Sequence, residues 1–348
     1  MKKSTNVKIS IAVAILLAAV FLLRGSPSEH PDSLATERYR ANENTTIENA
    51  TAELNSDDPD TLKIKPRHHG CLSGSFTVIS NLPDALQSAL FSPGANYPAQ
   101  IRFSAHHGDR SDIEPNMQGM AIKLFGVPGQ KMVRASNPDT HDFLLGSYPV
   151  LFSSNIESYL DGLQAIQNGK PLRYFYNPAN LQLGEYKLAK KMFSVQTDLT
   201  TMRWWSMVPY QFNEGQAVKY SVRPCQVDRN INNQPARNYG HGTTRDFLRE
   251  RLAETVRTSS LCYEFMVQIQ SDPQSMPIED PTADWDDALA PFQPVALLTT
   301  PNQDIDATEQ TQICRNLSFH PWQALPAHRP LGSINRGRKI IYSDIENQ

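Results

Sequence analysis

The stretch His320-Pro-Trp-Gln-Ala-Leu-Pro-Ala-His-Arg-Pro-Leu-Gly-Ser-Ile-Asn-Arg-Gly-Arg-Lys-Ile-Ile-Tyr342 lies almost at the end of this 348-residue chain. Its first half is punctuated by proline, and its second half suits a helix. Four residues separate Arg338 from Tyr342, so a helix places both on one face. A guanidinium beside a phenol oxygen favours the phenolate. Tyr342 is therefore a candidate metal ligand, and the alternative is an ordinary surface pair.

Composition narrows the classes of function. The formal net charge of −3 gives no reason to expect a nucleic-acid partner. Glycine-rich nucleotide-binding motifs and the G-x-S-x-G motif are absent from the sequence, so nucleotide binding and serine hydrolysis have no support. A hydrophobic content of 39% is typical of a globular chain.

The N-terminal residues read as a targeting segment. Lysines precede an apolar run over residues 9–23, which is short for a membrane span and suits a signal sequence. No small-x-small cleavage site follows, which favours an uncleaved anchor over a cleaved signal peptide. We expect residues 1–24 to be signal peptide or anchor, 25–60 to be a flexible linker, and 61–348 to be one exported domain, membrane-anchored or periplasmic.

The body alternates mostly like strands. In Ala99–Ala105, Ile101 and Phe103 point one way while Arg102 and Ser104 point the other. Four further segments show similar patterns, namely Gly74–Ser80, Gly119–Phe125, Ala217–Pro224 and Tyr263–Gln270. Helical patterns follow over 156–166, within 179–193, and from Thr243 with Asp246 as a capping partner. The fold class predicted is α+β, with an antiparallel sheet or barrel.

Four short sequence segments together resemble those of a known protein family. They are Pro98-Ala-Gln-Ile-Arg-Phe-Ser104, Gly119-Met-Ala-Ile-Lys123, Trp205-Ser-Met-Val-Pro-Tyr210 and the C-terminal stretch quoted above. The chain from near Thr61 to its end is similar to catalase-like haem proteins, of the short catalase-related type. The resemblance implies a β-barrel core with peripheral helices and haem b, with Tyr342 as the axial iron ligand. Phenolate oxygen is a known haem ligand.

The same resemblance assigns further residues. It implies that Arg338 stabilises the Tyr342 phenolate and that Arg102 pairs with a haem propionate. Ser104 matches the serine that supports the distal histidine.

The distal side departs from the family pattern. The register given by His69-Gly70-Cys71 puts Lys65 where the catalytic histidine is expected. Neighbouring residues on a strand face opposite ways, so at most one of His68 and His69 enters the pocket, by a shift of register. We take His69 as the candidate. Ser147 replaces the distal asparagine. Lys65 is either a ligand-stabilising cation or a solvated loop lysine.

Two features stay open. Cys71, Cys225, Cys262 and Cys314 have no CxxC spacing, and either disulfides or buried free thiols fit them. The pairs His68-His69 and His106-His107, with Asp109 and Asp112 nearby, suggest a metal site as an alternative to exposed or hydrogen-bonded histidines.

The resulting hypothesis is a haem-dependent oxidoreductase of catalase or peroxidase type. Its substrates are hydrogen peroxide or organic and lipid hydroperoxides, and the N-terminal segment contacts the membrane. A homo-oligomer is compatible with it. The alternatives are a non-enzymatic haem-binding or sensor protein, and a catalase-like scaffold without haem.

Overall fold

The computed structural model describes residues 67–108, 110–133, 138–167, 170–178, 180–225 and 244–346. The predicted leader 1–24, the linker 25–60, and the residues Lys65 and Asp109 lie outside these ranges. Within the ranges, no helix combines the length and apolarity that crossing a membrane requires.

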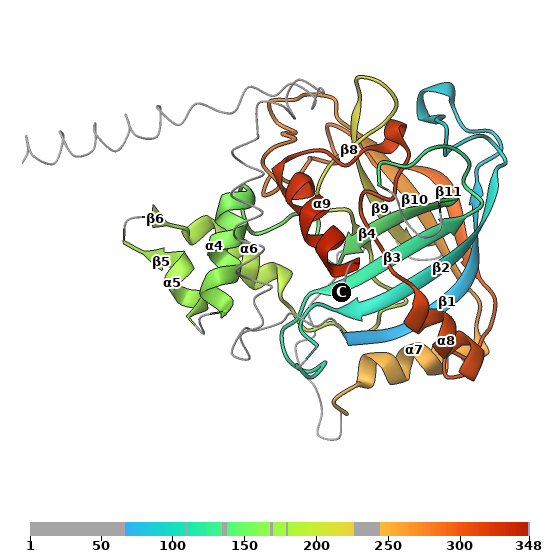
Figure 1. Ribbon diagram of the computed structural model, residues 1–348, viewed down its shortest axis with the longest axis horizontal. Helices are drawn as coiled ribbons and strands as arrows, with labels where there is room; N and C mark the ends of the chain where they lie inside the picture. The colour runs from blue at the N-terminus through green and yellow to red at the C-terminus, as the bar shows by residue number, and fades with distance from the viewer. Residues whose placement is uncertain are drawn as a thin grey trace, which may run out of the picture. The chain divides into compact units, whose positions relative to one another are not determined.

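An antiparallel barrel forms the core of the described residues (Figure 1). The strand order is β10-β11-β1-β2-β3-β4-β7-β9, and pairing between β9 and β10 closes the ring of eight. The strands are β1 (Arg67–Val78), β2 (Asn96–Ala105), β3 (Gln118–Phe125), β4 (Thr140–Gly146), β7 (Trp204–Trp205), β9 (Ala217–Pro224), β10 (Leu261–Ile269) and β11 (Gln293–Thr300). A short β8 (Tyr210–Gln211) adds to β9. The predicted antiparallel barrel is confirmed.

The barrel interior is filled by aromatic rings. Phe143 lies 4.7 Å from Phe265 between ring centroids, and Phe76 lies 5.1 Å from Phe265. On β2, Ile101 and Phe103 are fully buried, whereas Arg102 and Ser104 between them are only half-buried. The alternation predicted for this strand is therefore correct, and it turns Arg102 and Ser104 to the outer face.

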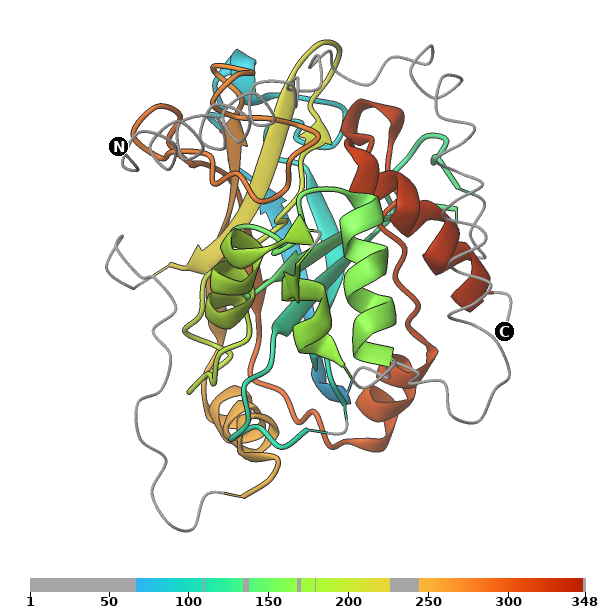
Figure 2. The same cartoon turned by 90° about the vertical axis from the view of Figure 1, so that its left-hand side faces the viewer.

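The helices lie outside the barrel. They are α4 (Ile156–Gln167), α5 (Pro171–Phe175), α6 (Leu183–Met192), α7 (Phe247–Thr258), α8 (Thr308–Asn316) and α9 (Ser333–Glu346). A hairpin of β5 (Tyr176–Asn177) and β6 (Asn180–Leu181) joins α5 to α6, and short 3-10 turns occur at Asp84–Leu86 and Pro326–His328. Helices α4 and α9 contact each other, and both views show α9 beside α4 (Figures 1 and 2).

One predicted helix start is wrong. Thr243, the predicted start, lies outside the described residues; residues 244–246 are not helical, and α7 begins at Phe247, with Asp246 at its N-cap position but without a side-chain capping bond. The Asp246 carboxylate instead pairs with Arg67 at the start of β1. A tertiary ion pair has therefore replaced the local capping interaction.

Both cysteine pairs form disulfides, which settles the question left open by the sequence. Cys71 on β1 bonds to Cys314 on α8, and Cys225 after β9 bonds to Cys262 on β10. The first bond fastens α8 to the outer face of the barrel, next to Arg102, because Cys71 is the register partner of Arg102.

Candidate functional site

The outer face of strands β1 to β4 presents small residues around a few polar side chains. One row across the strands comprises His68, Ser104, Gly119 and Gly146, and the next comprises Cys71, Arg102, Ala121 and Leu144. A Cβ added at Gly119 would lie 3.2 Å from the Ser104 hydroxyl oxygen. Because glycine has no side chain, the side chains of Arg102, Ser104 and His68 protrude from this face beyond the neighbouring glycine positions.

A β-bulge decides which histidine reaches this face. The pairing of β1 with β2 shifts between His68 and Gly70, so that His68 lies opposite Ser104. His68 stays accessible to solvent. Desolvation, and after it the positive charge of Arg102, lower the pKa of His68 to about 4. Its imidazole is therefore neutral at physiological pH and able to accept a proton.

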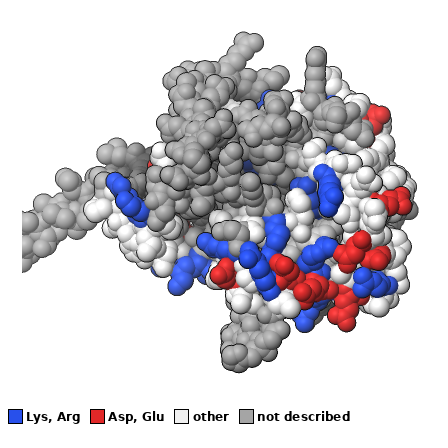
Figure 3. Space-filling view, turned by 60° about the horizontal axis from the view of Figure 1, so that its bottom comes forward, with Lys and Arg blue, Asp and Glu red and all other residues white. Residues whose placement is uncertain are grey.

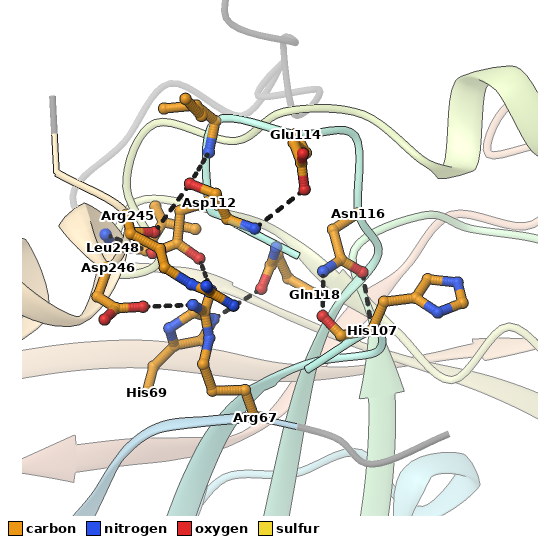
Figure 4. A network of polar contacts seen from close by, with 12 residues as sticks. Arg67, His69, His107, Asp112, Glu114, Asn116, Gln118, Arg245, Asp246 and Leu248 are labelled. Carbon is orange, nitrogen blue, oxygen red and sulfur yellow. Dashed lines mark hydrogen bonds and ion pairs between the residues drawn. The ribbon is translucent and has the colours of Figure 1, made fainter. Parts of the chain in front are cut away.

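His69, the histidine predicted to enter the site, is oriented elsewhere (Figure 4). It is buried, and its Nε2 lies 2.9 Å from Gln118 Oε1. Its backbone oxygen accepts a hydrogen bond from Arg249 of α7. Burial is the main cause that lowers the pKa of His69 to about 4. The bulge therefore places His68, and not the adjacent His69, on the outer face opposite Ser104.

A partly buried ion network holds the start of β1. Arg67 pairs with both Asp112 and Asp246, and Asp112 Oδ2 also accepts the Leu248 backbone N–H at 2.9 Å (Figure 4). These bonds fix Arg67, the residue directly before His68. Sequence reasoning missed this positioning role, because its three charged residues come from distant segments.

Arg102 is covered by the segment that follows α8. Its Nη1 donates to the Leu317 oxygen at 3.0 Å, and its guanidinium carbon lies 4.4 Å from the centre of the Phe319 ring. Its Nε is buried and has no hydrogen-bond partner. Burial lowers the pKa of Arg102, while Tyr342 and Asp142 oppose that shift through their charges. The charge of Tyr342 therefore reaches Arg102.

Helix α9 brings Arg338 and Tyr342 together as the four-residue spacing predicts. The Arg338 guanidinium carbon lies 5.6 Å from the centre of the Tyr342 ring. Burial alone would lower the pKa of Arg338, but the neighbouring phenols of Tyr342 and Tyr210 outweigh it and raise that pKa. The His320 ring lies 5.9 Å from that of Tyr342. The guanidinium is thus a permanent cation beside the phenol.

Ser147 lies just beyond β4 and is buried. Its hydroxyl oxygen accepts the Gln118 backbone N–H at 3.1 Å, and its own N–H donates to the Gln118 oxygen at 3.0 Å. It follows Gly146 directly and so borders the outer-face row that contains Ser104. Lys65 lies outside the described residues.

The alternative metal site gains no support. In the described parts of the chain, no three His, Cys, Asp or Glu side chains gather as metal ligands. His107 instead bonds through its backbone to the Asn116 side chain, and Asp112 belongs to the Arg67 network.

The residues around Tyr342 fit a haem group. A phenol with an adjacent guanidinium is a suitable iron ligand. The unpartnered Nε of Arg102 leaves hydrogen-bonding capacity for a carboxylate.

No protein-family model matches this sequence, and no curated protein matches it. In three dimensions the chain is similar to solved catalases, at 16% identity in each case. For a fungal catalase the TM-score is 0.62, covering 81% of this chain and 57% of that one. For catalase A from Saccharomyces cerevisiae the score is 0.63, with 93% and 68% covered, and for a bacterial catalase it is 0.59, with 92% and 62%.

These likenesses establish the fold, which is catalase-like. The chain spans 57% of the length of the fungal catalase. The activity of those larger proteins is therefore a matter for proposal in this chain.

Proposed function

We propose that this protein binds haem b and reacts with hydrogen peroxide or with organic and lipid hydroperoxides. The observation that carries the proposal is the meeting of Tyr342, Arg338 and Arg102. Two of these residues belong to α9 and the third to β2, yet the charge of Tyr342 acts on both arginines. A phenol with one guanidinium beside its ring and the charge of a second acting on it suits an oxygen ligand to a metal ion.

Each residue has a distinct role in holding the cofactor. Tyr342 supplies the oxygen ligand to iron, and Arg338 balances its negative charge. Arg102 binds a propionate through the guanidinium whose Nε lacks a partner. When bound, haem supplies the redox-active iron needed to cleave an O–O bond.

His68 is the proton acceptor in this proposal. Its neutral imidazole takes the proton of the hydroperoxide on a ring nitrogen and returns it to the leaving oxygen. Ser104, opposite it in the strand register, supports the ring. Lys65 and Ser147 remain predicted contributors to the distal side. The export and membrane tether predicted for residues 1–24, and a homo-oligomeric assembly, remain part of the proposal.

The test uses the full chain reconstituted with haem. Tyr342→Phe removes the ligand oxygen, and Tyr263→Phe is the matched control, because the Tyr263 hydroxyl is buried in the barrel without a partner. We expect a tyrosinate-type ferric spectrum in the wild type and the control, and its loss in Tyr342→Phe. The reaction is then followed after adding hydrogen peroxide or a lipid hydroperoxide.

The outcomes separate the rival functions. A bound haem that reacts with neither oxidant favours a haem sensor. A wild type that binds no haem refutes the proposal and leaves a catalase-like scaffold. An unchanged spectrum in Tyr342→Phe refutes the assigned ligand.

A further inference from the structure

Exposed apolar side chains gather on one short segment, which comprises α5, the β5–β6 hairpin and the start of α6. Among the described residues, seven large hydrophobic side chains are exposed, and four lie within this short segment. These four are Leu172, Tyr176, Leu181 and Leu183, with exposed fractions of 58%, 47%, 59% and 47%. We call these four residues the apolar tip. Such clustering marks an interaction surface, whereas single exposed apolar residues need no explanation.

The backbone makes the apolar tip continuous. Tyr176 and Leu181 are direct cross-strand partners in the β5–β6 hairpin. The Tyr176 N–H donates to the Leu172 oxygen, so these two residues lie one helical turn apart. Leu183 begins α6 directly after the hairpin. Helix α5 and the β5–β6 hairpin lie on the side of the molecule away from the barrel strands (Figure 1).

Cations surround the apolar tip. Residues 170–191 contain Lys170, Arg173, Lys187, Lys190 and Lys191, all exposed. The only carboxylate of this stretch, Glu185, is buried and bonded to Tyr174 and to the Ser154 N–H. Lys190 lies over the Tyr186 ring, which in turn contacts the Tyr176 ring at 5.4 Å. Positive charge therefore directly adjoins the apolar side chains.

The charge pattern differs from that of a neighbouring surface. Near α7 and α8, acidic and basic side chains alternate, as in the pairs of Arg249 with Asp306 and Arg257 with Asp304. Figure 3 shows this mixture of red and blue, while the side of the molecule toward α5 and α6 shows blue with little red. Within residues 170–191 the exposed charge is thus entirely basic, and the exposed acids Glu157 and Asp161 lie on the adjoining helix α4.

We propose that the apolar tip and its cations dock on the surface of an anionic phospholipid bilayer. Leucine side chains and a tyrosine enter the boundary between headgroups and acyl chains, and lysines bind the anionic headgroups. Tyrosine is enriched at this interface because its ring is apolar and its hydroxyl is polar. Five cations with no exposed carboxylate among them favour this occupant over a protein partner.

Docking would also select the substrate, and this step rests on the proposed function. Helix α4 contacts α5 on one side and α9 on the other. The charges of Tyr342 and Arg338 act on Tyr159 of α4. A bilayer at the apolar tip therefore lies close to the helix that borders the haem ligand, which favours lipid hydroperoxides over hydrogen peroxide.

The experiment measures the depth of the apolar tip in full-length protein bound to vesicles of phosphatidylserine and phosphatidylcholine. Vesicle association alone tests nothing, because the predicted N-terminal anchor also provides it. Tyr176→Trp places a reporter at the tip. Leu289→Trp is the control, since Leu289 is as exposed as Leu172 but lies outside the tip. Lipids brominated on their acyl chains quench indole fluorescence, and the four native tryptophans are buried.

We expect strong quenching at residue 176 and only background quenching at residue 289. Replacing Lys187, Lys190 and Lys191 by glutamate should abolish the difference in quenching between residues 176 and 289. Vesicles of phosphatidylcholine alone should also abolish it. Equal quenching at both positions overturns the proposal. Cross-linking of residue 176 between two copies, without quenching, overturns it in favour of a self-association surface. Haem-free protein gives the same docking result, so failure of the proposed catalysis is distinguished from failure of docking.

Discussion

Replacing His68 by glutamine tests the central chemical claim. A pKa of about 4 leaves about 0.1% of the imidazole protonated at pH 7, against about 24% for an ordinary histidine. About 90% or more of the wild-type base is therefore available from pH 8 down to about pH 5. Removing a general acid–base group lowers a rate typically by about 10²–10⁴-fold. We expect a loss of this size in His68→Gln, with haem binding retained.

The assay is stopped-flow reaction of the haem-reconstituted full chain with peroxide after a jump in pH. The wild-type rate should be flat from pH 8 to about 5 and fall to half near pH 4, where His68 becomes protonated. In His68→Gln the low remaining rate should not change over that range.

His69→Gln is the matched control, because His69 is the adjacent residue and belongs to the Gln118 contact instead. It should retain most of the rate. A large loss in His69→Gln together with a normal rate in His68→Gln would refute the geometry of the bulge and restore the sequence-based assignment.

Three other perturbations give quantitative expectations. His328 is buried and bonded to Ser88 and Tyr220, and burial lowers its pKa to about 3. Between pH 3 and pH 6.5 the unfolded chain binds a proton at this histidine and the folded protein does not. The contribution of His328 to folding stability is therefore complete above pH 6.5 and is lost as the pH falls below it. Between pH 7 and pH 5 the wild type should lose about 2 kcal/mol more unfolding free energy than His328→Gln, as measured by urea titrations at the two pH values. Equal losses in the wild type and the variant would contradict this expectation. Replacing both Cys71 and Cys314 by serine should lower the unfolding free energy by about 2–5 kcal/mol, measured by chemical denaturation, and an unchanged midpoint would show that the bond contributes nothing. Gly119→Ala places a methyl group 3.2 Å from the Ser104 hydroxyl oxygen on the outer face and should weaken haem binding roughly tenfold by overpacking. Gly184→Ala is the control, because no atom lies within 4 Å of the added methyl group, and it should leave haem binding unchanged. Equal haem affinities of the two variants in haem titrations would refute the role proposed for Gly119.

The sequence by itself determined the features that depend on local periodicity. The alternation along Ala99–Ala105 placed Arg102 and Ser104 on one face, and the segment Ala217–Pro224 matches β9 residue for residue. The four-residue spacing of Arg338 and Tyr342 fixed their meeting on one helix. These predictions succeeded because a period of two or of 3.6 residues acts within a single element.

Only the tertiary structure decided how distant elements complete the site. One extra residue in β1 exchanges the faces of His68 and His69, and no sequence period reveals such a bulge. Arg67 meets Asp112 and Asp246 only after α7 packs against β1. The disulfide of Cys71 with Cys314 and the approach of Tyr342 to Arg102 likewise join segments from opposite ends of the domain. Barrel closure brings these groups together, because long-range pairing, rather than local preference, sets which residues become neighbours.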